Sequence, residues 1–291
     1  MQWLVTGCSS GLGLSLARAI LRHPNQKVIA TSRNPTSSPK AVDEITSHEN
    51  GSWATLDVSS PILQSQLSQI IAQHGKVDVL INNAGYAIGG VLETLPLDRI
   101  HSQYDTNFFG PIRLMKAVIP SMRECGQGVI VNVSSAEFWD PHAGATVYAS
   151  SKWALEGLSE ALAAEVAAFG IRVLIAQPGG MRTDFVEPEK VARSLEPLPK
   201  AYEGTMADFV LKAIIGGHGA QSLDPEKAAE AVVEEVLKPS TVKDREGKEI
   251  GKLLRLQLGK ECVVMMDAKL QKFTSEAEVE KERALACDFS E

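Results

Sequence analysis

The sequence has few cysteines, few aromatic residues and no long run of apolar residues. Its four cysteines, Cys8, Cys125, Cys262 and Cys287, lie far apart without paired spacing, so a disulfide framework is not indicated. No apolar stretch is long enough to span a bilayer or to form the core of a signal peptide. We therefore expect reduced thiols, a cytoplasmic location, no integral membrane segment and no metal.

An excess of positive charge is also missing. The net charge of −7 gives no reason to expect a nucleic acid or an anionic membrane surface as a partner. No linker, charge block or internal repeat divides the 291 residues, of which 44% are hydrophobic. A chain of this size and composition can bury one sizeable core, so we expect one domain over residues 1–291.

Three glycines lie between an apolar run and a segment with helical spacing. Gln2–Thr6 is typical of a short buried strand, and residues 12–21 carry apolar side chains at helical intervals. Gly7, Gly11 and Gly13 occupy the turn between them, where a side chain would keep a phosphate from the backbone or the helix from the sheet. The helix N-terminus would offer N–H groups and its dipole to the anion. A tight strand–helix turn without a ligand is the alternative.

Apolar runs rich in valine and isoleucine alternate with amphipathic stretches as far as residue 177. The expected strands are Gln2–Thr6, Lys27–Thr31, Trp53–Leu56, Val77–Asn82, Gly128–Val133 and Ile171–Gln177. The expected helices are Gly11–Arg22, Pro61–His74, Leu97–Cys125 and Val147–Phe169. Strands without polar alternation are buried on both faces, so the order predicts an α/β fold: a doubly wound, Rossmann-type parallel sheet with helices on both faces. Ligands bind beyond the carboxyl ends of such strands.

The regular pattern weakens after Asp184. Proline, glycine and charged residues accumulate over residues 184–223, which we expect to form a substrate-binding segment. The elements expected after it are a helix over Asp224–Leu237, a strand over Lys252–Leu258 and helices over Lys260–Lys272 and Glu276–Ala286. The last two helices form an extension over residues 259–291 that we expect to cover one edge of the sheet.

Polar motifs recur at the ends of the predicted strands and on the helices that follow. They are Asp57-Val58, Asn82-Asn83-Ala84-Gly85, Asn107, Ser134-Ser135, Tyr148 with Lys152, and Pro178-Gly179. Together with the glycine turn, in this order, they resemble the short-chain dehydrogenase/reductase family over residues 1–185. The glycine turn and Ala30–Arg33 are similar to the branch that contains 17β-hydroxysteroid and retinol dehydrogenases. The resemblance implies an oxidoreductase with a nicotinamide cofactor.

The resemblance also assigns residues to the cofactor. Those expected to contact it are Gly7, Ser9, Ser10, Gly11, Leu12, Gly13, Arg33, Asp57, Val58, Asn83, Ala84, Gly85, Tyr148, Lys152, Pro178, Gly179 and Thr183. Asp57 would bind the adenine amino group, and Thr183 the nicotinamide carboxamide. Ordinary turn formation is the alternative for Asp57 and for residues 83–85, because Asp and Asn are common turn residues.

The end of the second predicted strand has no carboxylate. An NAD site usually places Asp or Glu there to accept hydrogen bonds from the adenosine ribose. This sequence has Arg33 instead, whose guanidinium suits a 2′-phosphate, and Ser9 or Ser10 would add a hydroxyl donor. We therefore expect NADP(H) rather than NAD(H). A solvated loop residue is the alternative for Arg33.

Four residues are expected to perform the chemistry. Tyr148 and Lys152 are four residues apart, so they share one face of a helix. An ammonium group there, with the positive ring of the oxidised cofactor, would lower the pKa of the phenol from ~10. Tyr148 would then act as acid in reduction and base in oxidation. By the resemblance, Ser135 rather than Ser134 binds the substrate oxygen, and Asn107 holds a water beside the lysine; a helix bend near a proline is the alternative for Asn107.

The substrate site is expected beside these four residues. Its expected lining is Glu137, Phe138, Trp139, His142, Met181 and the segment 184–223. Such an apolar site suits a small lipophilic carbonyl or alcohol. Ordinary packing is the alternative for Phe138 and Trp139, and simple exposure is the alternative for His142.

Two other classes of function remain open. One is a dinucleotide-sensing regulator without turnover, although an intact Ser135, Tyr148 and Lys152 would serve no purpose in a sensor. The other is an epimerase or lyase that uses the nicotinamide transiently, although such relatives are usually longer and have a different glycine spacing. The family usually pairs subunits through the helices expected over Leu97–Cys125 and Val147–Phe169, which implies a homodimer or homotetramer.

Overall fold

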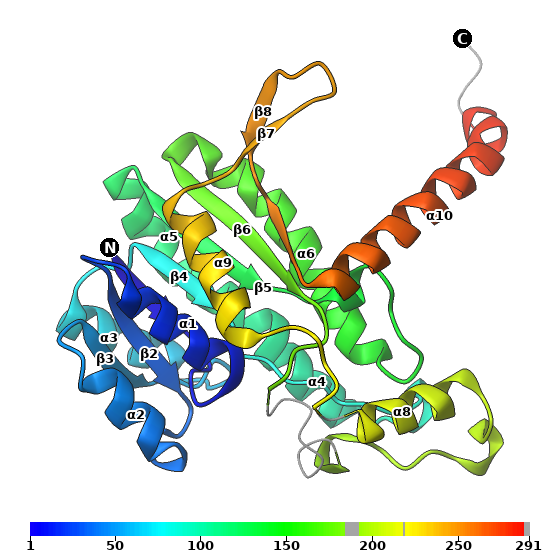
Figure 1. The fold of residues 1–291 in the computed structure, drawn as a ribbon, viewed down its shortest axis with the longest axis horizontal. Coiled ribbons are helices and arrows are strands. Elements are labelled where there is room, and N and C mark those ends of the chain that lie inside the picture. The colour runs from blue at the N-terminus through cyan, green and yellow to red at the C-terminus, as the bar shows by residue number, and fades with distance from the viewer. Residues whose placement is uncertain (184–191, 218, 288–291) are drawn as a thin grey trace.

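The computed structural model describes residues 1–183, 192–217 and 219–287. Its main sheet has seven parallel strands in the order β3-β2-β1-β4-β5-β6-β9 (Figure 1). These strands are β1 Gln2–Val5, β2 Lys27–Ser32, β3 Gly51–Thr55, β4 Val79–Asn82, β5 Gly128–Val133, β6 Ile171–Pro178 and β9 Arg255–Leu258. The helices include α1 Gly11–Arg22, α2 Pro39–Thr46, α3 Leu63–His74, α4 Leu97–Tyr104, α5 Gly110–Cys125, α6 Thr146–Val166, α8 Met206–Gly216, α9 Pro225–Leu237 and α10 Lys260–Leu285. The predicted doubly wound parallel sheet is confirmed.

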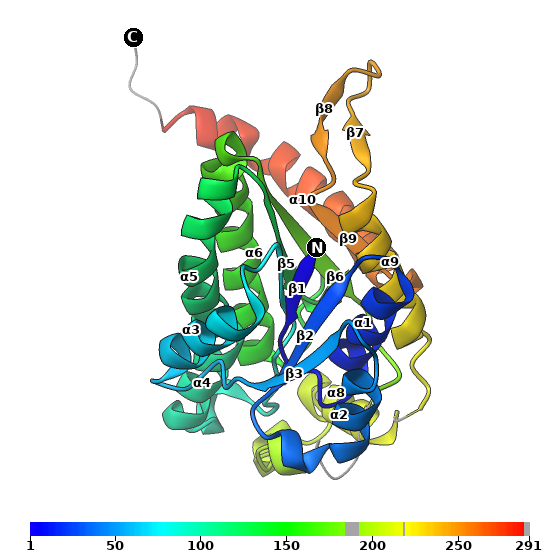
Figure 2. The same cartoon turned by 90° about the vertical axis from the view of Figure 1, so that its left-hand side faces the viewer.

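Helices cover both faces of the sheet (Figure 2). One face carries α1 and α9, and the other carries α3, α5 and α6. Neighbouring residues of β1 point to opposite faces, so that Trp3 packs in the core under α1 and α9 while Leu4 packs in the core under α3 and α5. Both side chains are fully buried. This two-sided burial explains why the strand sequences show no polar alternation.

The helix predicted over Leu97–Cys125 is interrupted. One π-helical turn, η3, spans Asp105–Phe109 between α4 and α5. Pro111 has no N–H to donate to the carbonyl of Asn107 four residues earlier, so one α-helical hydrogen bond is missing at this point. The helix is therefore irregular near the proline, as the alternative interpretation of Asn107 required, but the irregularity is a π-helical turn and the Asn107 side chain bonds Tyr86 and Ser151. Turns of this kind are frequent at functional sites.

The C-terminal part differs from the prediction in two places. The two helices expected after residue 259 are one continuous helix, α10, whose outer half runs away from the body of the molecule (Figure 1). The strand expected over Lys252–Leu258 is divided between β8 (Glu249–Lys252), which forms a hairpin with β7 (Thr241–Lys243), and β9, which pairs with β6. The sequence pattern does not predict α2, α8 or this hairpin, because short elements give weak periodic signals. Among the helices that the structure describes, none is both long and apolar enough to cross a membrane.

Candidate active site

The N-terminus of α1 has no side-chain cap. Ser10 precedes the first helical turn, and its hydroxyl makes no capping hydrogen bond. The first turn contains no acidic residue, so no carboxylate of the helix balances its positive dipole end or its N–H donors. An uncapped helix N-terminus behind a glycine turn suits a phosphate group.

Two glycines of this turn permit close backbone packing. A Cβ on Gly13 would lie 2.2 Å from the carbonyl oxygen of Gly7 and 2.5 Å from Asn83 Nδ2. Gly7 has a φ of +74°, and a Cβ there would lie 2.9 Å from Ala84 Cα. Thr6 connects the glycine turn to the loop after β4, a contact that sequence reasoning missed. Its hydroxyl accepts from the N–H groups of Asn83 (3.0 Å) and Ala84 (2.9 Å). The only signal for it was its place directly before the first glycine.

Ser135, Tyr148 and Lys152 come together where β5 ends and α6 begins. The Ser135 hydroxyl is hydrogen-bonded to the phenol of Tyr148. Lys152 Nζ lies 5.8 Å from the centre of the Tyr148 ring and donates to the carbonyl of Val133 at 2.8 Å. The hydroxyl of Ser134, in contrast, is buried without a partner among the described residues. Of the two serines, Ser135 is therefore the one placed against the tyrosine.

Burial is the largest influence on the pKa values of Tyr148 and Lys152. Burial raises the pKa of Tyr148 to about 12, while the hydrogen bond with Ser135 lowers it and the carboxylate of Glu137 raises it. Lys152 is 5% exposed, and burial lowers its pKa to about 8, against a raising effect of Glu156. The protein groups alone therefore raise the Tyr148 pKa, chiefly through burial, and the lowering expected from Lys152 together with the positive ring of the oxidised cofactor stays a prediction.

Asn107 holds two neighbouring segments together. Its Nδ2 donates to the carbonyl of Tyr86 at 2.9 Å and to Ser151 Oγ at 3.1 Å, and its Oδ1 accepts from the N–H of Tyr86 at 3.1 Å. The side-chain amide is therefore used by protein groups. A Cβ on Gly85 would lie 3.2 Å from Asn107 Oδ1 and 3.6 Å from Lys152 Nζ, which places both residues against the loop after β4.

A family model described as short chain dehydrogenase matches residues 2–193. The chain belongs to the short-chain dehydrogenase family. It is 41% identical over 218 residues to an oxidoreductase, claN, of Passalora fulva, and the match covers 74% of this chain and 95% of that protein. Retinol dehydrogenase 8 of Bos taurus is 41% identical over 191 residues, covering 62% of this chain and 59% of that protein. A solved short-chain dehydrogenase from Streptomyces avermitilis has a TM-score of 0.80 at 31% identity and covers 99% of this chain and 98% of its own.

Short-chain dehydrogenases are oxidoreductases that use a nicotinamide dinucleotide, and the residues of this chain fit such a group. The uncapped N-terminus of α1 suits its pyrophosphate, and the glycines before it leave no Cβ in the way. A cavity of about 420 Å³ lies beside this turn, with Ser9, Ser10, Ser38 and Lys40 in its wall. The Ser38 hydroxyl is buried without a partner among the described residues, so it is available to a polar ligand at the adenosine end.

Other residues assigned to the adenosine end have protein partners or lie apart from this cavity. Arg33 is exposed and does not line the cavity, and its charge lowers the pKa of Tyr86, which burial raises more strongly. Asp57 Oδ1 accepts from the N–H and the hydroxyl of Ser59 at 3.0 and 2.7 Å, which is the turn-forming role that we kept as the alternative. The Val58 side chain is buried in the core under α5.

The loop after β6 meets both the glycine turn and α10. A Cβ on Gly11 would lie 3.4 Å from Thr183 Cβ, so Thr183 is packed beside the glycine turn. Pro178 ends β6, and two residues later the N–H of Gly180 donates to the carboxylate of Glu261 in the first turn of α10. Sequence reasoning missed this link to α10. Residues 184–191 of the predicted substrate segment lie outside the described residues.

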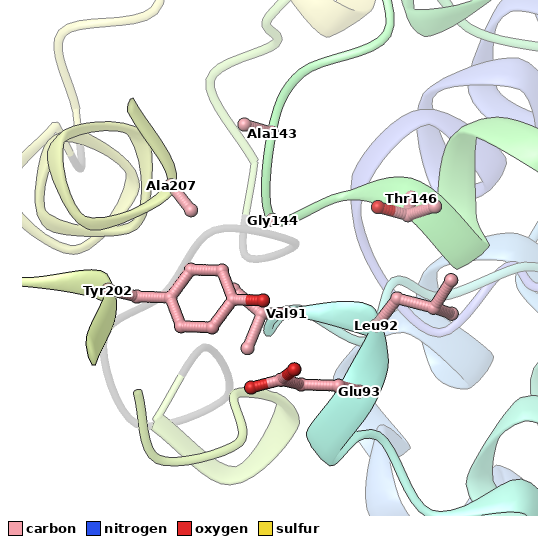
Figure 3. A pocket seen from close by; sticks show the side chains of 8 residues that line it. All are labelled: Val91, Leu92, Glu93, Ala143, Gly144, Thr146, Tyr202 and Ala207. Atoms are coloured by element: carbon pink, nitrogen blue, oxygen red, sulfur yellow. The ribbon is translucent and has the colours of Figure 1, made fainter. Parts of the chain in front are cut away.

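A cavity of about 410 Å³ lies beside the loop that leads into α6 (Figure 3). Its lining is Val91, Leu92, Glu93, Ala143, Gly144, Thr146, Tyr202 and Ala207. Tyr202 and Ala207 belong to the predicted substrate segment, and Thr146 lies two residues before Tyr148. Apolar side chains predominate in the wall, while Glu93 and two hydroxyls provide its polar groups.

Several residues expected in the substrate site have other surroundings. Phe138 and Trp139 pack against the first turns of α10, so the packing interpretation is correct for them. His142 is half-buried, and its Nδ1 lies 2.6 Å from Oε1 of Glu137, a contact that raises the pKa of the histidine. The interpretation of His142 as simply exposed is therefore wrong. Met181 packs against the core under α1 and α9.

Proposed function

We propose that this chain is an NADP(H)-dependent dehydrogenase/reductase that interconverts a lipophilic ketone or aldehyde and its alcohol, with Tyr148 as the acid/base. The observation that carries the proposal is the contact of the Tyr148 phenol with Ser135, beside the amine of Lys152. A carbonyl oxygen placed against both hydroxyls would receive a hydrogen bond from Ser135 and a proton from Tyr148. The nicotinamide supplies the hydride when it is bound.

The acidity of Tyr148 favours reduction at neutral pH. With a pKa of about 12, the phenol is protonated at pH 7 and its proton is available to a carbonyl oxygen. The ammonium of Lys152 stabilises the phenolate that remains after this transfer. Oxidation needs the phenolate from the start, so its rate should rise with pH until Lys152, with a pKa of about 8, loses its charge.

The main-chain carbonyl of Asn107 supports a route by which solvent returns a proton to Tyr148. Both side-chain N–H donors of Asn107 are used by Tyr86 and Ser151, and its Oδ1 accepts from the N–H of Tyr86, so we assign the predicted water to the main-chain carbonyl instead. The carbonyl oxygen lacks its α-helical donor because Pro111 has no N–H. We include in the proposal a water bound between this carbonyl and Lys152, through which solvent returns a proton to Tyr148.

The preference for NADP(H) is supported by the cavity beside the glycine turn. Lys40 lines it and forms no ion pair with the described residues, so its charge is available to a 2′-phosphate. The carboxylate of Glu44 also lines it, but Arg18 Nε holds Glu44 Oε1 at 2.6 Å. Ser38 adds a buried hydroxyl without a partner, and Arg33 is the cation nearest to the end of β2.

This preference is tested by titrating both dinucleotides. We expect Lys40→Gln and Arg33→Asp each to weaken NADPH binding by roughly tenfold and to leave NADH binding unchanged, because each loses a charge-assisted bond to the 2′-phosphate. Lys27→Gln, at the opposite end of β2, is the matched control and should bind as the wild type does. A wild type that binds or uses NAD(H) as well as NADP(H) would overturn the assignment.

The cavity of Figure 3 and exposed apolar side chains of its wall and of α8 support the proposal of a lipophilic substrate. Leu92 in the cavity wall is exposed, and so are Met206 and Phe209 on α8, the helix that contributes Ala207 to the wall, although such side chains are usually buried. One relative, retinol dehydrogenase 8, is named for a lipophilic alcohol. We expect kcat/KM to rise with the apolar size of a ketone series until the cavity is filled.

The reaction itself is tested by Tyr148→Phe with a panel of ketones and alcohols. We expect turnover to disappear while dinucleotide affinity stays within about twofold of the wild type. Tyr104→Phe is the matched control, because its hydroxyl bonds Ser150 Oγ at 3.0 Å on the exposed side of α6. Retained turnover in Tyr148→Phe would remove Tyr148 from its role. In the wild type, product without net cofactor consumption would identify an epimerase, and binding without product would identify a sensor.

A further inference from the structure

A buried carboxylate follows the proposed catalytic residues on α6. Glu156 comes four residues after Lys152, as Lys152 comes four residues after Tyr148, so the three side chains share one face of the helix. Glu156 is 0% exposed. Because an unpaired carboxylate inside a protein is unfavourable, the partners of Glu156 are informative.

Glu156 has two direct partners from different strands. Gln177 Nε2 donates to its Oε1 at 2.7 Å, and Arg255 Nε donates to its Oε2 at 3.0 Å. Arg255 also donates to Glu160 at 2.7 Å, and its guanidinium lies 5.6 Å from the centre of the Phe138 ring. The guanidinium of Arg255 thus contacts Glu156, Glu160 and the Phe138 ring, and these contacts fix the position of the Glu156 carboxylate.

The same network reaches the other parts of the site. Gln177 directly precedes Pro178, and its Oε1 accepts from Trp139 Nε1 at 3.1 Å and from Gln257 Nε2 at 3.2 Å. Trp139 follows Ser135 by four residues. Arg255 and Gln257 belong to β9, which lies beyond the residues 2–193 that match the family model. The C-terminal strand therefore completes a polar network behind the catalytic helix.

We propose that Glu156 is a positioning residue that keeps Lys152 in its ammonium form, and that Gln177 and Arg255 hold its carboxylate for this purpose. The proposal rests on the proposed function, which gives the charge of Lys152 its purpose. Lys152 Nζ donates to a neutral acceptor, the carbonyl of Val133, and burial lowers its pKa to about 8. Glu156 is the group that raises this pKa again, so without it a larger fraction of the amine would be neutral at and above neutral pH.

The other titratable groups around this network either pair with a charged partner or titrate in a different pH range from Lys152. On α6 they are Tyr148, with a pKa of about 12, and Glu160, which is paired with Arg255 of β9. On α10, burial raises the pKa of Cys262 to about 11. Glu137 acts on Tyr148 from the segment after Ser135, and the contribution of β6 is the uncharged Gln177. Of the three buried groups Tyr148, Cys262 and Lys152, Lys152 is therefore the one whose pKa is brought to about 8.

The test is a titration of Lys152 in the wild type and in Glu156→Gln. The readout is NMR of the lysine Cε signals in ¹³C-labelled protein without cofactor, with the Lys152 signal assigned from Lys152→Arg. Loss of the carboxylate charge should lower the Lys152 pKa by about one unit. The alkaline limb of the pH profile for carbonyl reduction should shift equally, so kcat falls roughly tenfold at pH 9 and less than about twofold at pH 6.

The matched control is Glu160→Gln. It removes the same charge from the next turn of α6 and also loses a contact with Arg255, but we expect it to leave the Lys152 titration unchanged. Glu156→Asp keeps the charge and should titrate close to the wild type. If Glu156→Gln does not fold, the double variant Glu156→Gln/Arg255→Gln leaves no unpaired buried charge, and a smaller downward shift is expected because the loss of the Arg255 cation partly offsets the loss of the carboxylate.

Three results would overturn the proposal. They are an unchanged Lys152 pKa in Glu156→Gln or the double variant, an equal shift in Glu160→Gln, and a Glu156→Asp variant that titrates like Glu156→Gln. The last result would assign the effect to packing rather than charge. An absence of turnover in the wild type would contradict the proposed function instead, and the NMR titration would still decide the role of Glu156.

Discussion

At the scale of single residues, Lys152 and Tyr148 make stability depend on pH in opposite directions. The folded pKa of Lys152, about 8, is below its usual 10.5, so the unfolded chain binds more protons between these values and stability rises with pH there. The folded pKa of Tyr148, about 12, is above its usual 10.0, so the folded chain keeps the proton and stability falls as pH rises from 10 to 12. Both pKa shifts follow from burial, which disfavours the ammonium of Lys152 and the phenolate of Tyr148, the charged forms that the chemistry uses.

Lys152→Met should therefore stabilise the protein while it removes activity. The apolar side chain occupies similar space without a buried charge, and we expect the free energy of unfolding at pH 7 to rise by about 1–3 kcal/mol. Urea unfolding at pH 7 and pH 10.5 measures this, and the advantage of the variant should shrink at the higher pH. A variant less stable than the wild type at pH 7 would show that the amine contributes packing or hydrogen bonding that outweighs its burial.

A pair of glycine variants tests the packing of the cofactor turn. Gly13→Ala should lower the free energy of unfolding by about 1–3 kcal/mol and weaken dinucleotide binding, because its Cβ would lie 2.2 Å from the carbonyl oxygen of Gly7. Gly157→Ala, with nothing within 4 Å of its Cβ on α6, should raise stability by up to about 1 kcal/mol. Calorimetry and dinucleotide titration measure both variants. Equal stability of the two would contradict the close approach.

At the scale of elements, the sequence predicted what burial on both faces determines. The strands that carry the site were found within two residues of their ends, because a strand such as β5 has no solvent-facing side to add polar residues. The π-helical turn was not predicted as such, since residues 105–109 continue the spacing of a helix. The pairing of Glu156 with Arg255 was also missed. Glu156 and Arg255 are 99 residues apart in the sequence, and they meet because β9 lies beside β6 in the sheet. No local sequence pattern shows such a long-range contact.

Pro111→Ala tests the purpose of the π-helical turn. The alanine restores an N–H four residues after Asn107, so the carbonyl of Asn107 gains an α-helical donor and is withdrawn from the proposed water. We expect kcat for carbonyl reduction to fall several-fold with a larger solvent isotope effect, while stability is unchanged or higher. Pro120→Ala, farther along α5, is the control and should leave kcat unchanged. An unaltered kcat in Pro111→Ala would remove this carbonyl from the proton route.

At the scale of the whole molecule, α10 divides into a docked part and an exposed part. Cys262, Met265 and Met266 pack against Ala136 and Trp139, next to Ser135. Glu261 in the same turn accepts a hydrogen bond from the loop after β6. Residues 271–287 are exposed throughout, and Figure 1 shows this part of the helix leading away from the sheet. The docked turn therefore supports the site from outside the region of family resemblance, and the exposed part is expected to add little to folding.

Two truncations separate these contributions. Removing residues 277–291 takes away only exposed helix and the residues after it, so the free energy of unfolding should change by less than about 0.5 kcal/mol and kcat should be retained. Removing residues 260–291 uncovers Trp139 and breaks the contact of Glu261 with Gly180, so stability should fall by at least about 2 kcal/mol with a loss of kcat. Urea unfolding and the ketone assay measure both. If the shorter truncation were as damaging as the longer one, the outer half of α10 would have to be packed in solution, and a second copy of the chain would be the first partner to test by sedimentation.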